Sequence, residues 1–215
     1  MKTFTTIALD GAAASGKTTT SKIIAQKYDF MRISTGEYYR AITYFLLQAH
    51  VSTSDQEAIT RELDKLTLGS TIVGNKSCII VNGTEIKNEI LRSTEINTNV
   101  SQFAQVPTIR KFLFEYQRSQ LDIAKQHAFH GLIAEGRDIC SVIFPDADLR
   151  FFLHADLKKR EQRRHKDAEK DCISCRDSLD TNITTDPKNV IAIDTGINDL
   201  QQVEAIISHY IEELY

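Results

Sequence analysis

A glycine-rich stretch near the start of the chain carries the clearest chemistry. It has the form Gly-x-x-x-x-Gly-Lys-Thr from Gly11 to Thr18 and directly follows the apolar run 4–10. The two glycines let the backbone bend around a phosphate chain, and the small residues between them keep side chains away from the anion. Lys17 would place its charge beside the β- and γ-phosphates, and Thr18 would offer a hydroxyl to Mg²⁺. The pattern predicts a nucleotide-binding loop; a plain Gly/Ala-rich turn between a strand and a helix is the alternative.

Two further polar segments follow apolar runs. The segment 34–40, Ser-Thr-Gly-Glu-Tyr-Tyr-Arg, comes after a predicted strand at 30–33, and the segment 135–138, Glu-Gly-Arg-Asp, comes after a predicted buried strand at 131–134. Ligands of parallel sheets bind at the carboxyl ends of the strands. Acidic and basic groups at that edge suit a site where Mg²⁺ and phosphates meet, whereas a surface turn with an internal ion pair is the alternative for 135–138.

The elements that must position these groups alternate between strand and helix, which is typical of an α/β domain with a parallel sheet. We predict strands at 4–10, 30–33, 131–134, 149–153 and 190–194, and helices at 17–28, after residue 40, and at 53–66, 95–104, 107–125, 157–169 and 200–215. The segment 70–86 breaks this rhythm with two β-rich runs and two turn signals. It predicts a small antiparallel insertion over the mouth of the site.

Length and composition limit the class of protein. The 215 residues suffice for one α/β domain with an inserted subdomain. A net charge of −3 gives no basic field for nucleic acid, and no run is long and apolar enough for a membrane helix. Because the chain enters its first strand without room for a signal peptide, we expect a cytoplasmic protein with the cysteines Cys78, Cys140, Cys172 and Cys175 reduced. We also expect a monomer.

The predicted helix at 157–169 is crowded with positive charge. It holds Lys158, Lys159, Arg160, Arg163, Arg164, His165 and Lys166. A solvated helix face is one interpretation; a lid that brings arginines to a phosphate chain and excludes water is the other. The pair Cys172 and Cys175 follows, and two ordinary thiols are favoured over zinc ligands because only His165 lies close in sequence as a further ligand.

Several segments together carry a resemblance that goes beyond the loop. They are 8–18, 34–40, Ser101, 107–110, 117–118, 135–139, 142–148 and 160–164. Together they resemble the bacterial-type cytidylate kinases over most of the chain. Gly-Arg-Asp-Ile at 136–139 with Val-Ile-Phe-Pro-Asp-Ala-Asp at 142–148 is the most specific part, because it separates this family from adenylate, guanylate and shikimate kinases.

The resemblance implies an α/β P-loop NTPase fold. It implies a parallel five-stranded sheet flanked by helices, an inserted NMP-binding subdomain with a small antiparallel sheet at 60–100, and a short lid at 157–187. It also implies transfer of the ATP γ-phosphate to CMP or dCMP with Mg²⁺, giving CDP or dCDP.

The same resemblance assigns roles to individual residues. Those implied to bind ATP are Gly11, Ala12, Ala13, Ala14, Ser15, Gly16, Lys17, Thr18 and Thr19, with Thr18 on Mg²⁺. Those implied to bind CMP are Thr35, Tyr39, Arg40, Ser101, Arg110, Arg137, Asp138, Arg176 and Asp180. Those implied to be catalytic are Lys17, Arg40, Arg137, Asp138, Arg160 and Arg164.

The chain departs from the family pattern in three places. Ser34 replaces an aspartate, Cys140-Ser141 replaces Gly-Thr, and Leu179 and Ile183 replace two arginines of the lid. Each such arginine can contribute roughly 1.5–3 kcal/mol through charge-assisted phosphate contacts. Two alternatives therefore stay open: a P-loop kinase with another acceptor such as UMP, and a nucleotide-binding regulatory protein with reduced catalysis.

Overall fold

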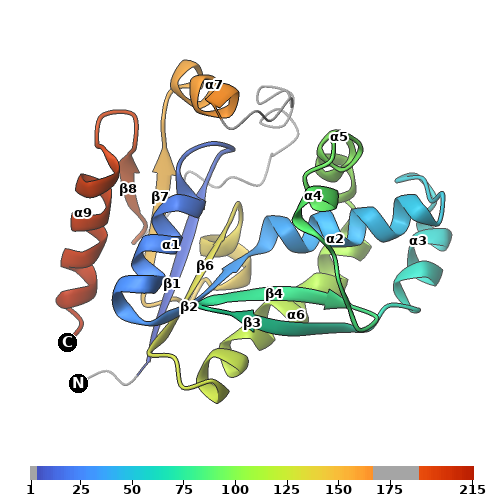
Figure 1. The fold of residues 1–215 in the computed structure, drawn as a ribbon, viewed down its shortest axis with the longest axis horizontal. Coiled ribbons are helices and arrows are strands. Elements are labelled where there is room, and N and C mark those ends of the chain that lie inside the picture. Colours follow the sequence, from blue (N-terminus) through green and yellow to red (C-terminus); the bar gives the residue numbers. More distant parts are fainter. Residues whose placement is uncertain (1–3, 167–188) are drawn as a thin grey trace.

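One mixed sheet forms the centre of the molecule in the computed structural model, which describes residues 4–166 and 189–215 (Figure 1). The strand order is β3-β4-β2-β6-β1-β7-β8, and β5 pairs with β4. Strands β2, β6, β1, β7 and β8 are parallel throughout, so the predicted five-stranded parallel sheet is confirmed. The bounds are β1 Thr5–Gly11, β2 Phe30–Ser34, β3 Leu68–Val73, β4 Lys76–Val81, β5 Thr84–Glu85, β6 Gly131–Gly136, β7 Leu149–His154 and β8 Ile191–Asp194.

Most helices lie where the sequence predicts them. The helices are α1 Lys17–Tyr28, α2 Thr35–Gln48, α3 Gln56–Leu63, α4 Asn88–Leu91, α5 Thr94–Phe103, α6 Pro107–Gln126, α7 Leu157–Lys166 and α9 Leu200–Glu212. Helix α4 was not predicted, and α2 begins at Thr35 rather than after residue 40. Helix α3 is shorter than the predicted 53–66 because Asp55 caps it, accepting a hydrogen bond from the Ala58 N–H. Across the described residues, every helix is too short or too polar to cross a membrane.

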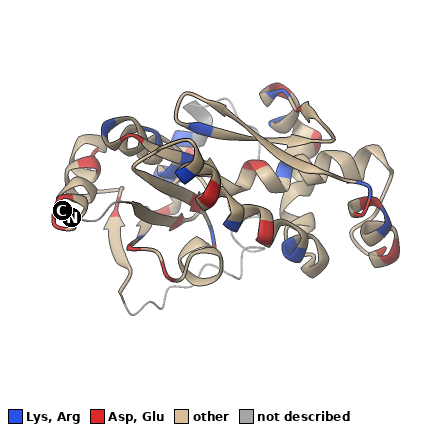
Figure 2. Cartoon of the chain, turned by 90° about the horizontal axis from the view of Figure 1, so that it is seen from below, with Lys and Arg blue, Asp and Glu red and all other residues tan. Residues whose placement is uncertain are grey.

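Side-chain alternation along the strands divides the interior between the two faces of the sheet. Ile7 of β1 and Ile133 of β6 lie in a cluster with residues of α1 and α9. Their neighbours Ala8 and Ala134 lie in a larger cluster with residues of α2, α5 and α6. Successive side chains of a strand point to opposite faces of the sheet. A polar residue near the end of a strand therefore faces α1 only if it lies on the same face as Ile7 and Ile133. Acidic and basic residues are interspersed along the outer helices (Figure 2).

The predicted antiparallel insertion is present as the hairpin of β3 and β4, but it continues the main sheet. Strand β4 pairs with β2 through the single register pair Arg32 and Lys76, and the Arg32 N–H donates to the Asn75 carbonyl at 2.7 Å. The hairpin is also hydrogen bonded to α6: the Gln120 side chain of that helix bonds to Ser77 of β4 and to Ser70 of β3. The hairpin supplies no lining residue to the first hollow described below, whereas Arg92, which follows α4, and Val100 and Ser101 of α5 do. The expected place of the hairpin over the mouth of the site stays a prediction.

A short π-helical turn, η1 Ile139–Ile143, follows β6 and was not predicted. Asp10 at the end of β1 fixes it, because the two carboxylate oxygens accept the N–H groups of Ile139 and Cys140, each at 2.8 Å. Burial raises the pKa of Asp10, and these two N–H groups oppose the shift. The Cys140 thiol, one of the departures from the family pattern, is buried within reach of the Ala8 and Phe151 carbonyls. Cys78 and Cys140 are both unbridged; Cys172 and Cys175 lie outside the described residues.

The close contact of β6 with β1 and β2 gives a first prediction. A Cβ on Gly131 would overlap the Thr5 carbonyl oxygen and lie 2.8 Å from Cδ1 of Phe30. Gly131→Ala should lower the free energy of unfolding by about 1–3 kcal/mol through overpacking, measured by urea denaturation. The control is Gly69→Ala, whose Cβ would meet its nearest neighbour at 3.8 Å; it should change stability by less than about 0.5 kcal/mol. Equal losses in both variants would contradict this packing.

Candidate active site

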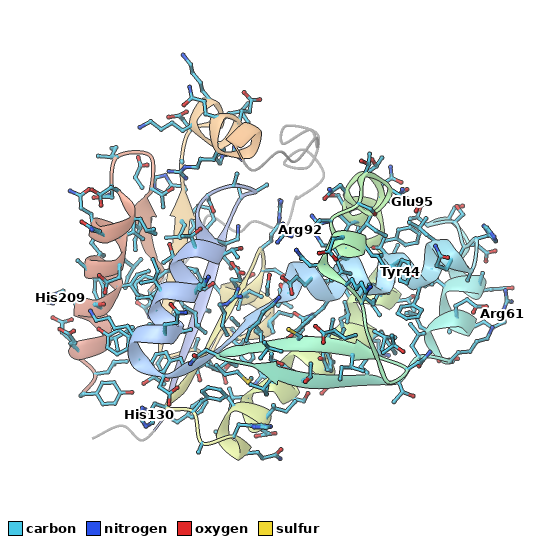
Figure 3. The ribbon with its side chains drawn as sticks, in the orientation of Figure 1. Tyr44, Arg61, Arg92, Glu95, His130 and His209 are labelled. Atoms are coloured by element: carbon cyan, nitrogen blue, oxygen red, sulfur yellow. The ribbon has the colours of Figure 1, made fainter. Side chains whose placement is uncertain are left out.

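Two neighbouring hollows open at the carboxyl ends of the parallel strands and share the loop between β1 and α1. The first is lined by Ala13, Ala14, Lys17, Thr18, Ser34, Thr35, Gly36, Glu37, Tyr39, Arg40, Arg92, Val100, Ser101, Ala104, Gln105, Arg110, Glu135, Gly136, Arg137 and Asp138. The second is lined by residues 14–20 together with Arg92, Arg163, Thr195, Asn198, Asp199, Leu200 and Val203. Figure 3 shows Arg92 near α4 on this side of the molecule, and His130 at the opposite end of the strands.

The predicted phosphate loop has the geometry that its glycines imply. A Cβ on Gly11 would overlap the Leu153 carbonyl oxygen, and Gly16 has φ +95° directly before α1. Ala14 has φ +58°, a left-handed conformation that costs an alanine about 1–2 kcal/mol. The Lys17 ammonium donates to the carbonyls of Gly11 and Ala12, both at 2.7 Å. The loop is thus held in a bent, strained shape at the N-terminus of a helix, which attracts anions.

A chain of polar side chains links β2, β6 and the start of α1. The Thr18 hydroxyl donates to one carboxylate oxygen of Glu135 at 3.0 Å, and the Arg32 guanidinium donates to the other at 3.4 Å. Glu135 is 2% exposed and Arg32 is 9% exposed. Burial raises the pKa of Glu135, while Lys17 and Arg32 oppose the shift. The ionised carboxylate therefore reduces stability at neutral pH, and this loss is recovered as the pH falls through the folded-state pKa.

This arrangement suits a metal ion that is held mainly by a nucleotide. Within the described residues, no three His, Cys, Asp or Glu side chains come together as a metal site. Mg²⁺ typically keeps several waters and binds through one or two protein oxygens plus substrate phosphates. The Thr18 hydroxyl, with its proton directed to Glu135, offers such an oxygen at the edge of the loop.

Arg110 and Asp138 form an ion pair on the wall of the first hollow. Arg110 also donates to the Ala104 carbonyl at 3.2 Å, so its guanidinium is fixed on two sides. Ser101, on α5, lines the same hollow. Tyr39 lies nearby, where burial raises the pKa of its phenol. Donor and acceptor groups therefore converge on one wall, as expected for a site that reads a polar ring.

Arg40 is buried between α2 and the α4–α5 region. Its guanidinium donates to the Leu91 carbonyl at 2.8 Å and to Asn97 Oδ1 at 2.7 Å. The Asn97 amide in turn donates to the Arg92 carbonyl at 2.8 Å. The residue predicted to bind the acceptor phosphate thus also fixes the loop that carries Arg92 into both hollows.

Helix α7 places its arginines against the loop. Arg160 donates to the carbonyls of Ala13 and Ala155, at 3.3 and 3.1 Å. Arg163 donates to the Ala14 carbonyl at 3.2 Å and also binds Thr195. The Arg164 side chain, and all of Arg176, Leu179, Asp180 and Ile183, lie outside the described residues, as does most of the predicted lid at 157–187.

The structure brings most of the predicted residues together in the two hollows. Thr35, Tyr39, Arg40, Ser101, Arg110, Arg137 and Asp138 line the first, and Ser15, Gly16 and Thr19 line the second with Lys17 and Thr18. Arg32, Asn97 and Thr195 were not predicted as site residues, and Glu135 was predicted only as part of the polar segment 135–138, without a role of its own. Glu135 lay within a motif that was recognised, and an arginine inside the apolar run 30–33 was a signal that a buried partner must exist. Asn97 and Thr195 carried no such signal.

Comparison with known proteins identifies the family. The family model for cytidylate kinase matches residues 7–213. The chain belongs to the cytidylate kinase family. A cytidylate kinase of Geobacillus sp. (strain WCH70) is 33% identical over 96% of both chains, and one of Listeria monocytogenes is 35% identical over 92% of this chain and 91% of that one. A bifunctional pantoate ligase/cytidylate kinase of Trichodesmium erythraeum is 35% identical over 84% of this chain, which spans 35% of its length.

Solved structures with the same architecture are distant in sequence. A sugar kinase from Janibacter sp. HTCC2649 aligns with a TM-score of 0.53 at 11% identity, covering 97% of this chain and 95% of that one. A gluconokinase from Sinorhizobium meliloti 1021 gives 0.50 at 11% identity, covering 100% and 95%. They share the fold of this chain, and the assignment to the cytidylate kinase family rests on sequence.

The buried pair of Arg32 and Glu135 gives a second prediction. Arg32→Met should lower the free energy of unfolding at pH 7 by about 3 kcal/mol, because it leaves the buried Glu135 carboxylate without the guanidinium that is paired with it. The loss should shrink toward acidic pH, where protonated Glu135 needs no partner. The double variant Arg32→Met/Glu135→Gln should lose less than the sum of the single variants. Arg61→Met is the control, since Arg61 is largely exposed beside Glu62. If the losses of stability from the substitutions at positions 32 and 135 were additive, that result would contradict the pairing.

Proposed function

We propose that the protein is a nucleoside monophosphate kinase that transfers the γ-phosphoryl group of ATP to CMP or dCMP, giving CDP or dCDP. One observation carries this proposal. A single hollow extends from Lys17 and Thr18 of the phosphate loop to Arg40, Arg110 and Arg137. A donor held by the loop and an acceptor held by the arginines would then face each other in one hollow, as in-line transfer requires.

The Arg110 and Asp138 pair suits cytosine. Cytosine carries an amino group, which donates, beside a ring nitrogen and a carbonyl oxygen, which accept. The Asp138 carboxylate would accept from the amino group, and the Arg110 guanidinium and Ser101 hydroxyl would donate to the acceptors. Uracil has a carbonyl in place of the amino group, so Asp138 would repel it. A fixed pair of this kind therefore favours CMP over UMP.

The remaining charges suit the phosphates. Arg40 and Arg137 would hold the acceptor phosphate, and Lys17 would neutralise the donor phosphates. Mg²⁺, when bound with ATP beside Thr18, would neutralise the β- and γ-phosphate oxygens. The second hollow, lined by Asn198 and Leu200 next to the loop, would take the nucleoside part of ATP. The protein's own contribution is placement and charge, because phosphoryl transfer requires little covalent chemistry from the enzyme.

Substitution of Lys17 tests the role of the loop. Lys17→Ala should reduce ADP formation with ATP and CMP by roughly 100-fold or more, since a cation beside the transferred group is lost. Lys22→Ala is the matched control, because Lys22 is exposed on the same helix. A coupled ADP assay with CMP, dCMP, UMP and dTMP as acceptors gives the measurement. Tight ATP binding without ADP formation for any acceptor would point to a regulatory protein and refute the proposal.

Substitution of Asp138 tests the acceptor. An asparagine at position 138 can still hydrogen bond to the edge of the pyrimidine ring, but it no longer repels the carbonyl that uracil has in place of the amino group. In Asp138→Asn, the ratio of kcat/KM for CMP to that for UMP should therefore fall by roughly tenfold or more. The same panel of acceptors measures it. A wild-type preference for UMP or for a non-nucleotide acceptor would show that the acceptor is assigned incorrectly, while the transfer of phosphate would stand.

A further inference from the structure

Five consecutive carbonyl groups of the phosphate loop accept hydrogen bonds from side chains. Lys17 donates to the first two, those of Gly11 and Ala12. The next three are bound from the C-terminal part of the chain: Arg160 donates to Ala13, Arg163 to Ala14 and Thr195 to Ser15, at 3.3, 3.2 and 3.0 Å. We call Arg160, Arg163 and Thr195 the carbonyl clasp.

Thr195 connects the parts of this clasp. It directly follows β8, is 6% exposed, and its hydroxyl lies within hydrogen-bond distance of both the Ser15 and the His154 carbonyls. Arg163 donates to the same hydroxyl at 3.1 Å and to the Thr195 carbonyl at 2.6 Å. One small buried side chain thus ties the loop to the end of β7 and to α7.

The direction of the carbonyls sets the direction of the N–H groups. In a planar trans peptide, the carbonyl and the N–H that follows it point to opposite sides. Carbonyls drawn toward the clasp therefore aim the N–H groups of Ala14 and Gly16 to the other side, where a phosphate chain would be cradled. The Ser15 N–H instead donates to the Ala12 carbonyl at 3.3 Å, which closes the turn of the loop. Ala14, at φ +58°, needs such support from its surroundings because its own conformation is unfavourable.

We propose that Thr195 is a positioning residue, which with Arg160 and Arg163 holds the loop carbonyls so that the loop is shaped for phosphates before a nucleotide binds. The proposal deepens the proposed function, since it concerns how the loop that would take ATP is prepared. Thr195 also lines the second hollow, so a direct contact with the nucleoside is the rival role. The two roles differ in the part of the nucleotide that they affect.

The test compares variants that differ at the Thr195 hydroxyl. Thr195→Ala and Thr195→Val remove it, whereas Thr195→Ser keeps it. Isothermal titration calorimetry measures binding of ADP and of inorganic tripolyphosphate, which has no nucleoside. We expect roughly tenfold weaker binding of both ligands in the alanine and valine variants and a change within about twofold in the serine variant. Thr5→Val is the control, because Thr5 is a buried threonine that bonds to Tyr215 at the opposite end of β1.

Three results would overturn the proposal. They are unchanged tripolyphosphate affinity in Thr195→Ala, an equal loss in Thr195→Ser, or a loss confined to ADP, which would indicate a contact with the nucleoside. If Thr195→Val does not fold, the alanine and serine pair decides, because its members differ by one oxygen atom. None of these measurements uses an acceptor, so failure of the clasp and failure of CMP turnover are separate results.

Discussion

Charged groups at the carboxyl ends of β1, β2 and β6 must be satisfied with little help from water, and much of the structure depends on this constraint. A buried charge is costly unless it is paired and hydrogen bonded. Glu135 therefore lies between Arg32 and Thr18, and Asp10 accepts two N–H groups of η1. Arg40 is fixed on α4 and α5 in the same way. Each of these pairings also fixes the position of a neighbouring segment. The same charged side chains that line or adjoin the site therefore hold the surrounding helices and strands in place.

The phosphate loop shows the same constraint in its backbone. A loop that offers N–H groups to an anion turns its carbonyls to the other side, where they need donors. Lys17 supplies two of these donors, and the others come from α7 and from the residue after β8, far along the chain from the loop. The motif near the N-terminus thus depends on the C-terminal part of the sheet, and the strand order, with β7 and β8 beside β1, brings the two together.

Prediction from sequence succeeded where a local pattern fixes the outcome. Apolar runs and the Gly-x-x-x-x-Gly-Lys-Thr motif gave the parallel strands and α1, and the family resemblance gave most of the residues that line the first hollow. It failed where the outcome depends on tertiary partners. The junction of Arg32 with Lys76, the turn at η1 and the bonds of Thr195 depend on register and on contacts between segments far apart in sequence. No periodicity or composition encodes such contacts. Prediction of the lid beyond Lys166 concerns residues outside those described.

The hairpin of β3 and β4 extends the sheet and is also attached to the helical layer. Only the pair of Arg32 and Lys76 joins β4 to β2 in register, whereas Gln120 of α6 bonds to both hairpin strands. Proteins open in cooperative units that follow their strongest internal contacts. In native-state hydrogen exchange, the amide protons of the hairpin should therefore exchange together with those of α6, ahead of β1 and β6. The hairpin and α6 would then open as one unit, while β1 and β6 stay protected.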